Sequence, residues 1–138
     1  MAKGIFIFDG NIGAAPELTF QPGNERSEGK PRPLLKFNVK YDRLVKTNNQ
    51  ENPYEDKGGF WIMIDYWKND SEALSKLLQK GMRVRIEGEL RLDTWPDKEY
   101  PDQINSGMAL TASLISIMPH RLQSVSLKER LPHSEKIM

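Results

Sequence analysis

The chain has 138 residues, of which 38% are hydrophobic and 28% are charged. This length and polarity are typical of one soluble domain, and no stretch approaches the roughly 20 apolar residues that span a membrane. The absence of cysteine is typical of a reducing compartment such as the cytoplasm, where we expect the protein. The 20 Lys and Arg nearly balance the 19 Asp and Glu, so the net charge of +1 indicates no partner by itself. Since cysteine is absent and only two histidines occur, we expect no disulfide, no metal site and no cofactor.

Three strands are predicted in the first half of the chain. Ile5–Phe8 are apolar and precede Asp9-Gly10-Asn11, where glycine can hold a bulge or bend. Apolar and polar residues alternate from Leu35 to Asp42, which is typical of a half-buried strand. A nearly continuous apolar run follows at Phe60–Trp67. Two segments have no periodicity and are predicted to be loops. The first is 20–33, and the second, a hairpin loop, is 46–59.

A helix is the next predicted element. Its apolar stripe consists of Ala73, Leu74, Leu77 and Leu78. Residues 69–71 offer N-caps, and Gly81 offers a C-cap. A fourth strand is expected at 82–92, with Gly88 at a bend and five side chains pointing inward: Met82, Val84, Ile86, Leu90 and Leu92.

The last predicted strand covers Met108–Met118. Its apolar phase slips near Leu114 and Ile115, which predicts a bulge or a change of packing partner. Between the fourth and fifth strands, Asp93–Gly107 is predicted to be a polar loop that carries Trp95 near its tip. Beyond Pro119 the sequence has no pattern.

Five strands with one short helix between the third and fourth favour an all-β fold, the partly open five-stranded Greek-key barrel called the OB-fold. A two-layer α+β sandwich is the competing architecture. We expect the domain to span residues 1–121 and a tail to span residues 122–138.

Three tryptophans are the most informative side chains. Trp61 and Trp67 share one face of the third strand with Asp65, whereas Ile62, Ile64 and Tyr66 share the other face. A carboxylate in the middle of the Trp face disfavours burial of that face. Trp95 lies in a polar segment with little apolar surface to cover it. The alternatives are that the first two indoles belong to the core and that Trp95 docks on the barrel.

Exposed indoles beside cations suit single-stranded nucleic acid, because bases stack on aromatic rings and cations contact phosphates. The candidate cations are Lys36, Lys40, Arg43, Lys68, Lys80, Arg83, Arg85 and Arg91. For any single cation, an ion pair on a solvated sheet face is an equally good interpretation. The sequence lacks a Gly-rich phosphate loop and a nucleophile with a base, so an enzyme is not expected.

At four places the sequence resembles the bacterial single-stranded DNA-binding protein family. Gly10–Leu18 resembles the segment after that family's first strand, and Phe60–Trp67 resembles its third strand. Leu77–Leu90 resembles its signature of a helix end, Lys-Gly and Val-x-Ile/Val-Glu-Gly-x-Leu, and Asp93–Trp95 falls where the family has a loop Trp. The order and spacing of the four stretches are specific, and the resemblance that they carry extends over residues 3–121.

The resemblance implies an OB-fold, usually a homotetramer, that binds single-stranded DNA without sequence preference in replication, repair, recombination or mobile-element maintenance. It implies base stacking at Trp61, Trp67 and Trp95 and a DNA path along Lys80 and Arg91. It also implies a bacterial protein associated with the nucleoid. A further stacking aromatic that some members carry is replaced here by Leu44 and Val45.

The C-terminal sequence departs from the family pattern. It is short and not acidic, so we interpret the chain as a divergent member without the acidic tip that recruits partner proteins. The alternative function is an OB-fold accessory module of replication restart or conjugation that acts mainly through protein partners. A dimer is compatible with that alternative.

Overall fold

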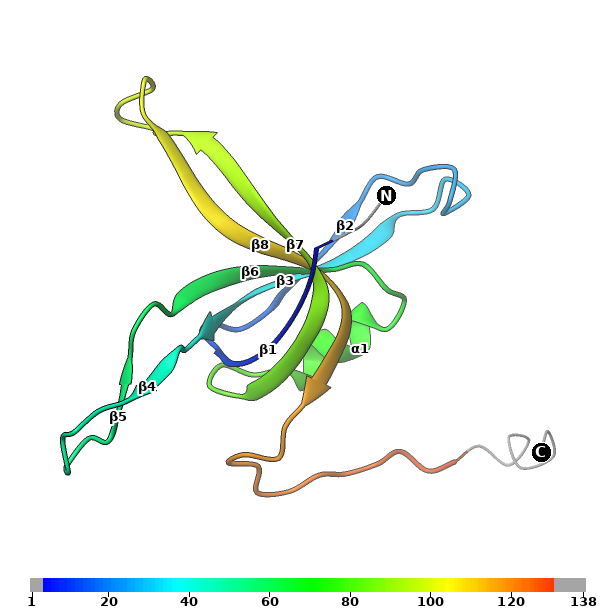
Figure 1. Cartoon of the computed structure of the whole chain (residues 1–138). Helices are drawn as coiled ribbons and strands as arrows, with labels where there is room; N and C mark the ends of the chain where they lie inside the picture. The colour runs from blue at the N-terminus through cyan, green and yellow to red at the C-terminus, as the bar shows by residue number, and fades with distance from the viewer. Residues whose placement is uncertain (1–3, 131–138) are drawn as a thin grey trace.

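The computed structural model describes residues 4–130. Strands dominate it, with one helix after the sixth strand (Figure 1). The elements are β1 (Ile5–Ile12), β2 (Glu17–Gln21), β3 (Arg32–Tyr41), β4 (Leu44–Lys46), β5 (Tyr54–Asp56), β6 (Phe60–Tyr66), α1 (Ser71–Leu77), β7 (Arg83–Pro96) and β8 (Ile104–Ile117).

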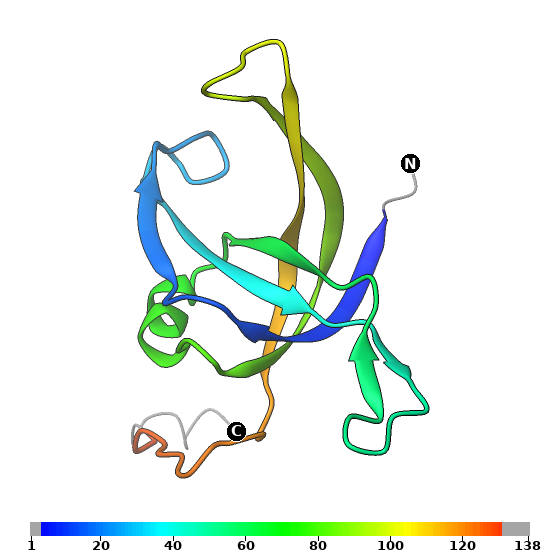
Figure 2. The ribbon, with the colours of Figure 1, turned by 90° about the vertical axis from the view of Figure 1, so that its left-hand side faces the viewer.

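The five strands that the sequence predicts form a ring of pairings. The sheet order is β1-β7-β8-β6-β3-β2, and β3 also pairs with β1. All of these pairs are antiparallel except β6–β8, which is parallel. This ring, with α1 between β6 and β7, has the strand count and helix position that define the predicted OB-fold. Figure 2 shows the strands curling around a common interior.

Apolar side chains of alternate residues fill the interior of this ring. Ile62, Ile64 and Tyr66 of β6 are buried, as the alternation predicts. Val84 and Ile86 of β7 face them from the other side of the core. Burying these five side chains is what favours a curled sheet over a flat one, because the strands share one interior instead of two half-exposed faces.

Glycine lets β1 pass between two partners. The predicted strand ends at Phe8, but β1 continues to Ile12. Gly10 pairs with Val84 of β7 and with Tyr41 of β3, and a Cβ at Gly10 would overlap the carbonyl oxygen of Lys40. Glycine at position 10 therefore lets the backbone of β1 lie close to the backbone of β3 while β1 still pairs with β7.

The helix is shorter than its apolar stripe. Leu74 and Leu78 pack on the core, but Ala73 and Leu77 are exposed, so half of the predicted stripe is wrong. Asp70 stands at the N-cap without a capping bond, because its carboxylate accepts the Tyr66 hydroxyl at 2.7 Å. Among residues 4–130, no helix has the length and apolarity needed to cross a membrane.

Three hairpins project from the strand ring (Figures 1 and 2). The segment predicted as a loop at 93–107 is mostly strand, because β7 runs to Pro96 and β8 begins at Ile104. Trp95 is therefore on a strand opposite Asn105, and the prediction of a loop tip is wrong. Leu92, predicted to point inward, is 62% exposed because it lies where the pair leaves the core. The segments 20–33 and 46–59 carry the other two hairpins, β2–β3 and β4–β5.

The predicted irregularity in the last strand is confirmed. Glu87 pairs with Leu114 but Gly88 pairs with Ala112, so Ser113 is an extra residue in β8. The bulge turns Leu114 outward and Ile115 toward the core. After Ile117, the described residues to 130 form no helix or strand. Residues 131–138, part of the predicted tail, lie outside the described range.

Candidate nucleic-acid interface

The outer face of β3 and β6 presents the first indole. Register places Lys40 beside Trp61, Asn38 beside Met63 and Lys36 beside Asp65, all on the outer face. The Trp61 side chain is 51% exposed. Its ring lies over Gly13, where a Cβ would come within 2.6 Å of the indole Cη2. The indole therefore packs against this glycine while one side of it stays open to solvent.

Lys40 is close to both the indole and a carboxylate. Its Nζ lies 5.9 Å from the centroid of the Trp61 ring and 3.6 Å from Asp56 of β5. A cation over an aromatic face is attracted by the ring quadrupole. Trp61 and Lys40 thus form an aromatic platform with an adjacent positive charge.

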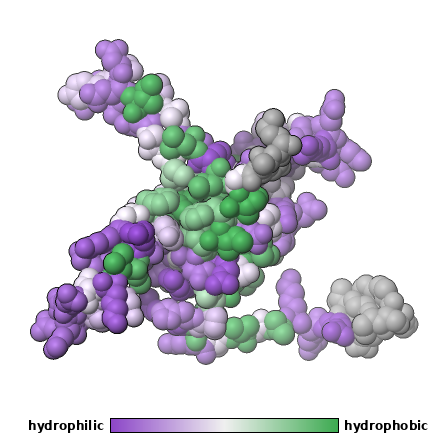
Figure 3. Space-filling model, viewed as in Figure 1, coloured by the Kyte–Doolittle hydropathy of each residue, from purple (hydrophilic) through white to green (hydrophobic). Residues whose placement is uncertain are grey.

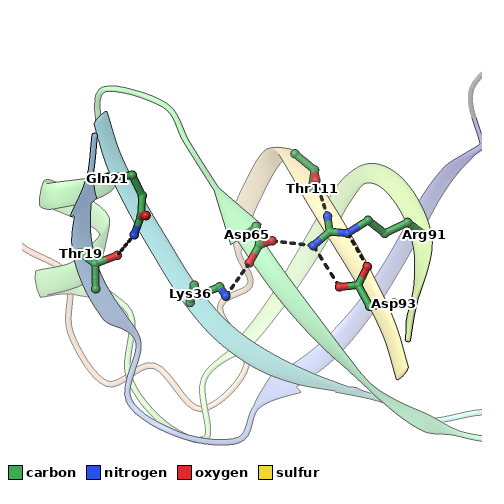
Figure 4. A network of polar contacts seen from close by, with 7 residues as sticks. All are labelled: Thr19, Gln21, Lys36, Asp65, Arg91, Asp93 and Thr111. Carbon is green, nitrogen blue, oxygen red and sulfur yellow. Dashed lines mark hydrogen bonds and ion pairs between the residues drawn. The ribbon is translucent and has the colours of Figure 1, made fainter. Parts of the chain in front are cut away.

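A polar network joins the Trp61 face to the base of the β7–β8 arm (Figure 4). Arg91 donates to Asp65 at 2.7 Å, to Asp93 at 3.0 Å and to the Thr111 hydroxyl at 2.6 Å. Lys36 lies 3.9 Å from the other oxygen of Asp65. The hydrogen bond with Asp65 is the largest cause that raises the pKa of Arg91 above its ordinary value; desolvation by burial opposes this rise, and Asp93 adds to it.

This network changes the interpretation of Asp65. The sequence analysis takes the carboxylate of Asp65 as a reason for the Trp face to be exposed. Asp65 itself is only 7% exposed, so that expectation is wrong for this residue. Arg91 reaches it from β7 and compensates its charge, which makes burial tolerable. Trp61 and Met63 on the same face remain exposed.

Trp67 lies at the end of the same strand face, beside the β2–β3 hairpin. Its indole is half-buried, and the guanidinium carbon of Arg32 lies 4.8 Å from the ring centroid. Trp67 also forms part of the wall of an open hollow of about 620 Å³ under the hairpin turn. This indole is the least exposed of the three, yet it borders space that a ligand can enter.

Trp95 stands on the β7–β8 arm and is 47% exposed. A Cβ at Gly107 would lie 3.2 Å from its ring, so the indole rests on the backbone of the neighbouring strand. The turn of the arm is held by Asp97, which accepts the backbone N–H groups of Glu99 and Tyr100. These bonds, with that to Asn105, hold the pKa of Asp97 below its usual value.

The remaining candidate cations are spread over other parts of the surface. Arg85 forms two bonds with Asp9, at 2.6 and 3.0 Å, and Arg83 donates to Asn11, both at the end of β7 remote from Trp95. Arg43 donates to the Lys57 carbonyl, and Lys68 donates to the Ser113 carbonyl. Lys80 borders a shallow hollow after α1. The structure thus brings Lys36, Lys40 and Arg91 together with the indole face. The backbone N–H of Arg43 donates to Asp56, the partner of Lys40, whereas Lys80, Arg83 and Arg85 lie elsewhere.

Three cations near Trp67 are absent from the sequence prediction. Arg26, Lys30 and Arg32 line the hollow that Trp67 borders. They fall in a segment rich in Gly and Pro, which has no periodicity to indicate which side chains share a face. The available signal was composition, three cations within seven residues.

The strand ring and the helix between β6 and β7 define the OB-fold class, and solved structures agree. A small single-stranded DNA-binding protein from Streptomyces coelicolor superposes with a TM-score of 0.67 at 16% identity, covering 88% of this chain and 99% of that one. A Plasmodium falciparum SSB in complex with ssDNA superposes with a TM-score of 0.62 at 15% identity, covering 86% and 97%. The predicted fold class is thereby confirmed.

The chain belongs to the Single-strand binding protein family, whose profile matches residues 5–118. A Single-stranded DNA-binding protein of Corynebacterium glutamicum is 30% identical over 95 residues, 65% of this chain and 36% of that protein. Single-stranded DNA-binding protein 2 of Streptomyces coelicolor is 28% identical over 90 residues, 65% and 41%. The matched regions span about two fifths of the length of these relatives.

Proposed function

We propose that this protein binds single-stranded DNA without sequence preference and without catalysis. Trp61, Trp67 and Trp95 stack bases, and nearby cations contact phosphates. The observation that carries the proposal is that two indoles are about half exposed while their rings rest on glycine backbone. Family membership and the names of the relatives support the same ligand.

Stacking explains why sequence would matter little. Every base has an aromatic face, and a stacked base contributes roughly 1–3 kcal/mol whatever its identity. Among residues 4–130, no three His, Cys, Asp or Glu side chains are grouped so that they could hold a metal ion. The face instead offers flat rings and cations, which suit binding.

The cations of the Trp61 face must exchange partners when DNA binds. Lys36, Lys40 and Arg91 each contact a carboxylate in the free protein. A phosphate can contact them only in competition with Asp65, Asp56 or Asp93, so we expect these side chains to contribute less than unpaired cations would. Stacking then supplies most of the binding on this face.

The proposal includes self-association, as a tetramer or dimer. Ile5 and Ile7 of β1 and Leu114 of β8 are exposed, and Ile7, Glu87 and Leu114 lie side by side across three strands. Hydrophobic residues gather over β1, β7 and β8 near the centre of Figure 3. Residues 5–9 of β1 pair only with β7 among the described strands. An apolar face beside an open strand edge suits a second copy of the chain.

Light scattering tests the self-association. The mass of the wild-type protein is expected to be two or four times 15.9 kDa. The Ile5→Glu/Ile7→Glu variant should have a lower mass, because two charges would be buried in the contact. A monomeric wild-type protein at micromolar concentration would contradict this part of the proposal.

The proposed setting is DNA replication, repair, recombination or mobile-element maintenance, at single-stranded DNA of a bacterial nucleoid in the cytoplasm. We propose that residues 1–121 form the binding domain and residues 122–138 a tail.

Fluorescence anisotropy of labelled 30-nucleotide strands tests the function. Strands of dT, dC and mixed sequence should bind with similar affinity, and duplex DNA of the same length should compete poorly. Affinity should fall as salt rises, because phosphate contacts release counterions. Equal competition by duplex DNA, or binding of one sequence alone, would refute the proposal.

A further inference from the structure

We propose that the hollow under the β2–β3 turn is a separate subsite for one nucleotide of the bound strand. Its base contacts Trp67, and its phosphates contact Arg26, Lys30 and Arg32. This inference rests on the proposed function, which already includes stacking at Trp67, and adds to that ring three phosphate-contacting cations that the sequence did not indicate.

The hollow is formed by two segments that are distant in sequence. The turn between β2 and β3 supplies most of its lining, and Trp67 and Asn69 supply the rest from the segment between β6 and α1. Its volume of about 620 Å³ accommodates a nucleotide. Figure 2 shows the β2–β3 hairpin curling back on itself beside the strand ring.

Hydrogen bonds give the turn a defined shape. Asn24 and Ser27 bond reciprocally, since the Ser27 backbone N–H donates to Asn24 Oδ1 at 3.0 Å and the Asn24 N–H donates to Ser27 Oγ at 2.9 Å. The Gly29 N–H donates to the Asn24 carbonyl at 2.9 Å, with Gly29 at a φ of 78°. The turn therefore does not have to fold around a ligand before its side chains are presented.

The cations of the turn line the hollow, and its carboxylates do not. The turn contains Glu25 and Glu28 as well as the cations, but only Arg26, Lys30 and Arg32 line the hollow. Among the described residues, none of these three cations has a carboxylate at ion-pairing distance. The cations of the Trp61 face, in contrast, are all paired. The positive charge beside Trp67 is thus less compensated than the positive charge beside Trp61.

Arg32 links the charge to the aromatic ring. Its Nε donates to the Pro22 carbonyl at 3.1 Å, which holds the guanidinium over the Trp67 indole. A guanidinium fixed next to a ring can contact the phosphate of a nucleotide whose base lies against that ring. Asn24 Oδ1 accepts the Ser27 backbone N–H, and among residues 4–130 the side-chain N–H donors of Asn24 have no hydrogen-bond partner. These donors can bond an acceptor on the base or sugar.

Removing two of the cations tests the subsite. Arg26→Ala/Lys30→Ala is compared with Lys76→Ala/Lys128→Ala, which removes the same charge from exposed positions on α1 and after β8. Binding of oligo-dT is measured over a range of salt concentrations. The slope of log K against log salt should become shallower by about 1.4 in the first variant, since each single-strand phosphate contact contributes roughly 0.7. The control should keep the wild-type slope.

A single-indole protein reports on the hollow directly. Trp61→Phe/Trp95→Phe leaves Trp67 as the only tryptophan of the chain. Oligo-dT should quench its fluorescence, and adding Arg26→Ala/Lys30→Ala should raise the DNA concentration needed for half-quenching by at least tenfold at 0.2 M salt.

The outcomes separate the two proposals. If the wild-type protein does not bind oligo-dT, the proposed function fails. If it binds, but the Arg26→Ala/Lys30→Ala variant keeps the salt slope of the control or the Trp67 signal does not respond to DNA, the subsite is overturned alone. Thermal melts accompany each variant. If the alanine variant unfolds, Arg26→Gln/Lys30→Gln replaces it, with the same expected slopes.

Discussion

Trp61 and Trp95 are exposed to nearly the same extent, 51% and 47%, but different parts of the molecule support them. Trp61 is on β6, which pairs with β3 on one edge and with β8 on the other. Trp95 is on the part of β7 that leaves the core, where β8 is its one described partner. Two strands without a covering layer bury little apolar surface. Exposure alone therefore does not tell how firmly a stacking ring is held.

The network of Asp65, Arg91, Asp93 and Thr111 lies where these two regions meet, and disrupting it should have the largest effect. Arg91→Ala should lower the free energy of unfolding by about 2–3 kcal/mol, because a buried carboxylate loses its strongest hydrogen bond. Chemical denaturation measures this change.

Arg85→Ala is the matched control for that variant. It breaks an ion pair with Asp9 that is open to solvent, so its melting temperature should stay near the wild-type value. If Arg91→Ala and Arg85→Ala lose the same amount of stability, the Asp65–Arg91 network does not stabilise the junction of the arm with the strand ring, and the prediction fails.

Removing each indole compares the two supports directly. Trp61→Ala and Trp95→Ala should each weaken binding of oligo-dT by roughly 1–3 kcal/mol, the value of one stacked base. Only Trp61→Ala should also lower the melting temperature, since its ring covers Gly13. An equal loss of melting temperature for Trp95→Ala would show that the arm is part of the stable core.

Displacing the indoles without removing them gives a smaller effect. Gly13→Ala places a methyl group where the Trp61 ring lies, so the ring must move. We expect a loss in binding free energy below the roughly 1–3 kcal/mol of a whole stacked base, and a smaller loss of melting temperature than Trp61→Ala causes.

Gly107→Ala should have almost no effect on binding, because a Cβ there would lie 3.2 Å from the Trp95 ring and a small shift relieves the contact. Anisotropy titrations of both variants measure the difference. A stronger effect at Gly107 than at Gly13 would reverse the proposed order of rigidity.

Acid and alkali should act on different regions. Backbone hydrogen bonds from Tyr100 and Glu99 lower the pKa of the Asp97 carboxyl below its ordinary value of 3.8. These bonds therefore stabilise the arm turn fully at a pH above 3.8, and the stabilisation is lost as the pH falls through the lowered pKa. Burial, with the hydrogen bond to Asp70, raises the pKa of the Tyr66 hydroxyl from 10.0 to about 12. The protonated tyrosine therefore stabilises the fold fully at a pH below 10.0, and this stabilisation is lost as the pH rises through about 12.

Amide NMR of Glu99 and Tyr100 should detect the acid transition, and thermal melts should detect the alkaline one. Asp97→Ala should abolish the first, and Tyr66→Phe should remove the tyrosine contribution to the second. An acid transition that persists in Asp97→Ala would assign it to another carboxylate.

Periodicity predicted the elements that bury one face. Leu35, Phe37 and Val39 alternate with polar residues because one side of β3 packs on the core, and the slip at Leu114 marks a real bulge. The same method missed β2 and residues 93–96 of β7. In Glu17–Gln21 only Leu18 packs on the core, and the arm around Trp95 has no interior to bury. A strand without a buried face leaves no alternation in the sequence.

Charge compensation could not be predicted, because it depends on side chains from different strands. Arg91 contacts Asp65 from 26 positions away in the sequence. Arg32 lies over the Trp67 ring because the β2–β3 hairpin packs beside the segment that follows β6. Composition indicated which residue types were available. Which cation was already paired followed only from the strand register.

The central claim is that bare indoles stack unpaired bases, and tryptophan fluorescence tests it most directly. Oligo-dT added to the folded wild-type protein at low salt should quench the emission of its three tryptophans, and high salt should reverse the quenching. Unchanged emission at saturating oligo-dT and low salt would contradict the claim, whatever the fold.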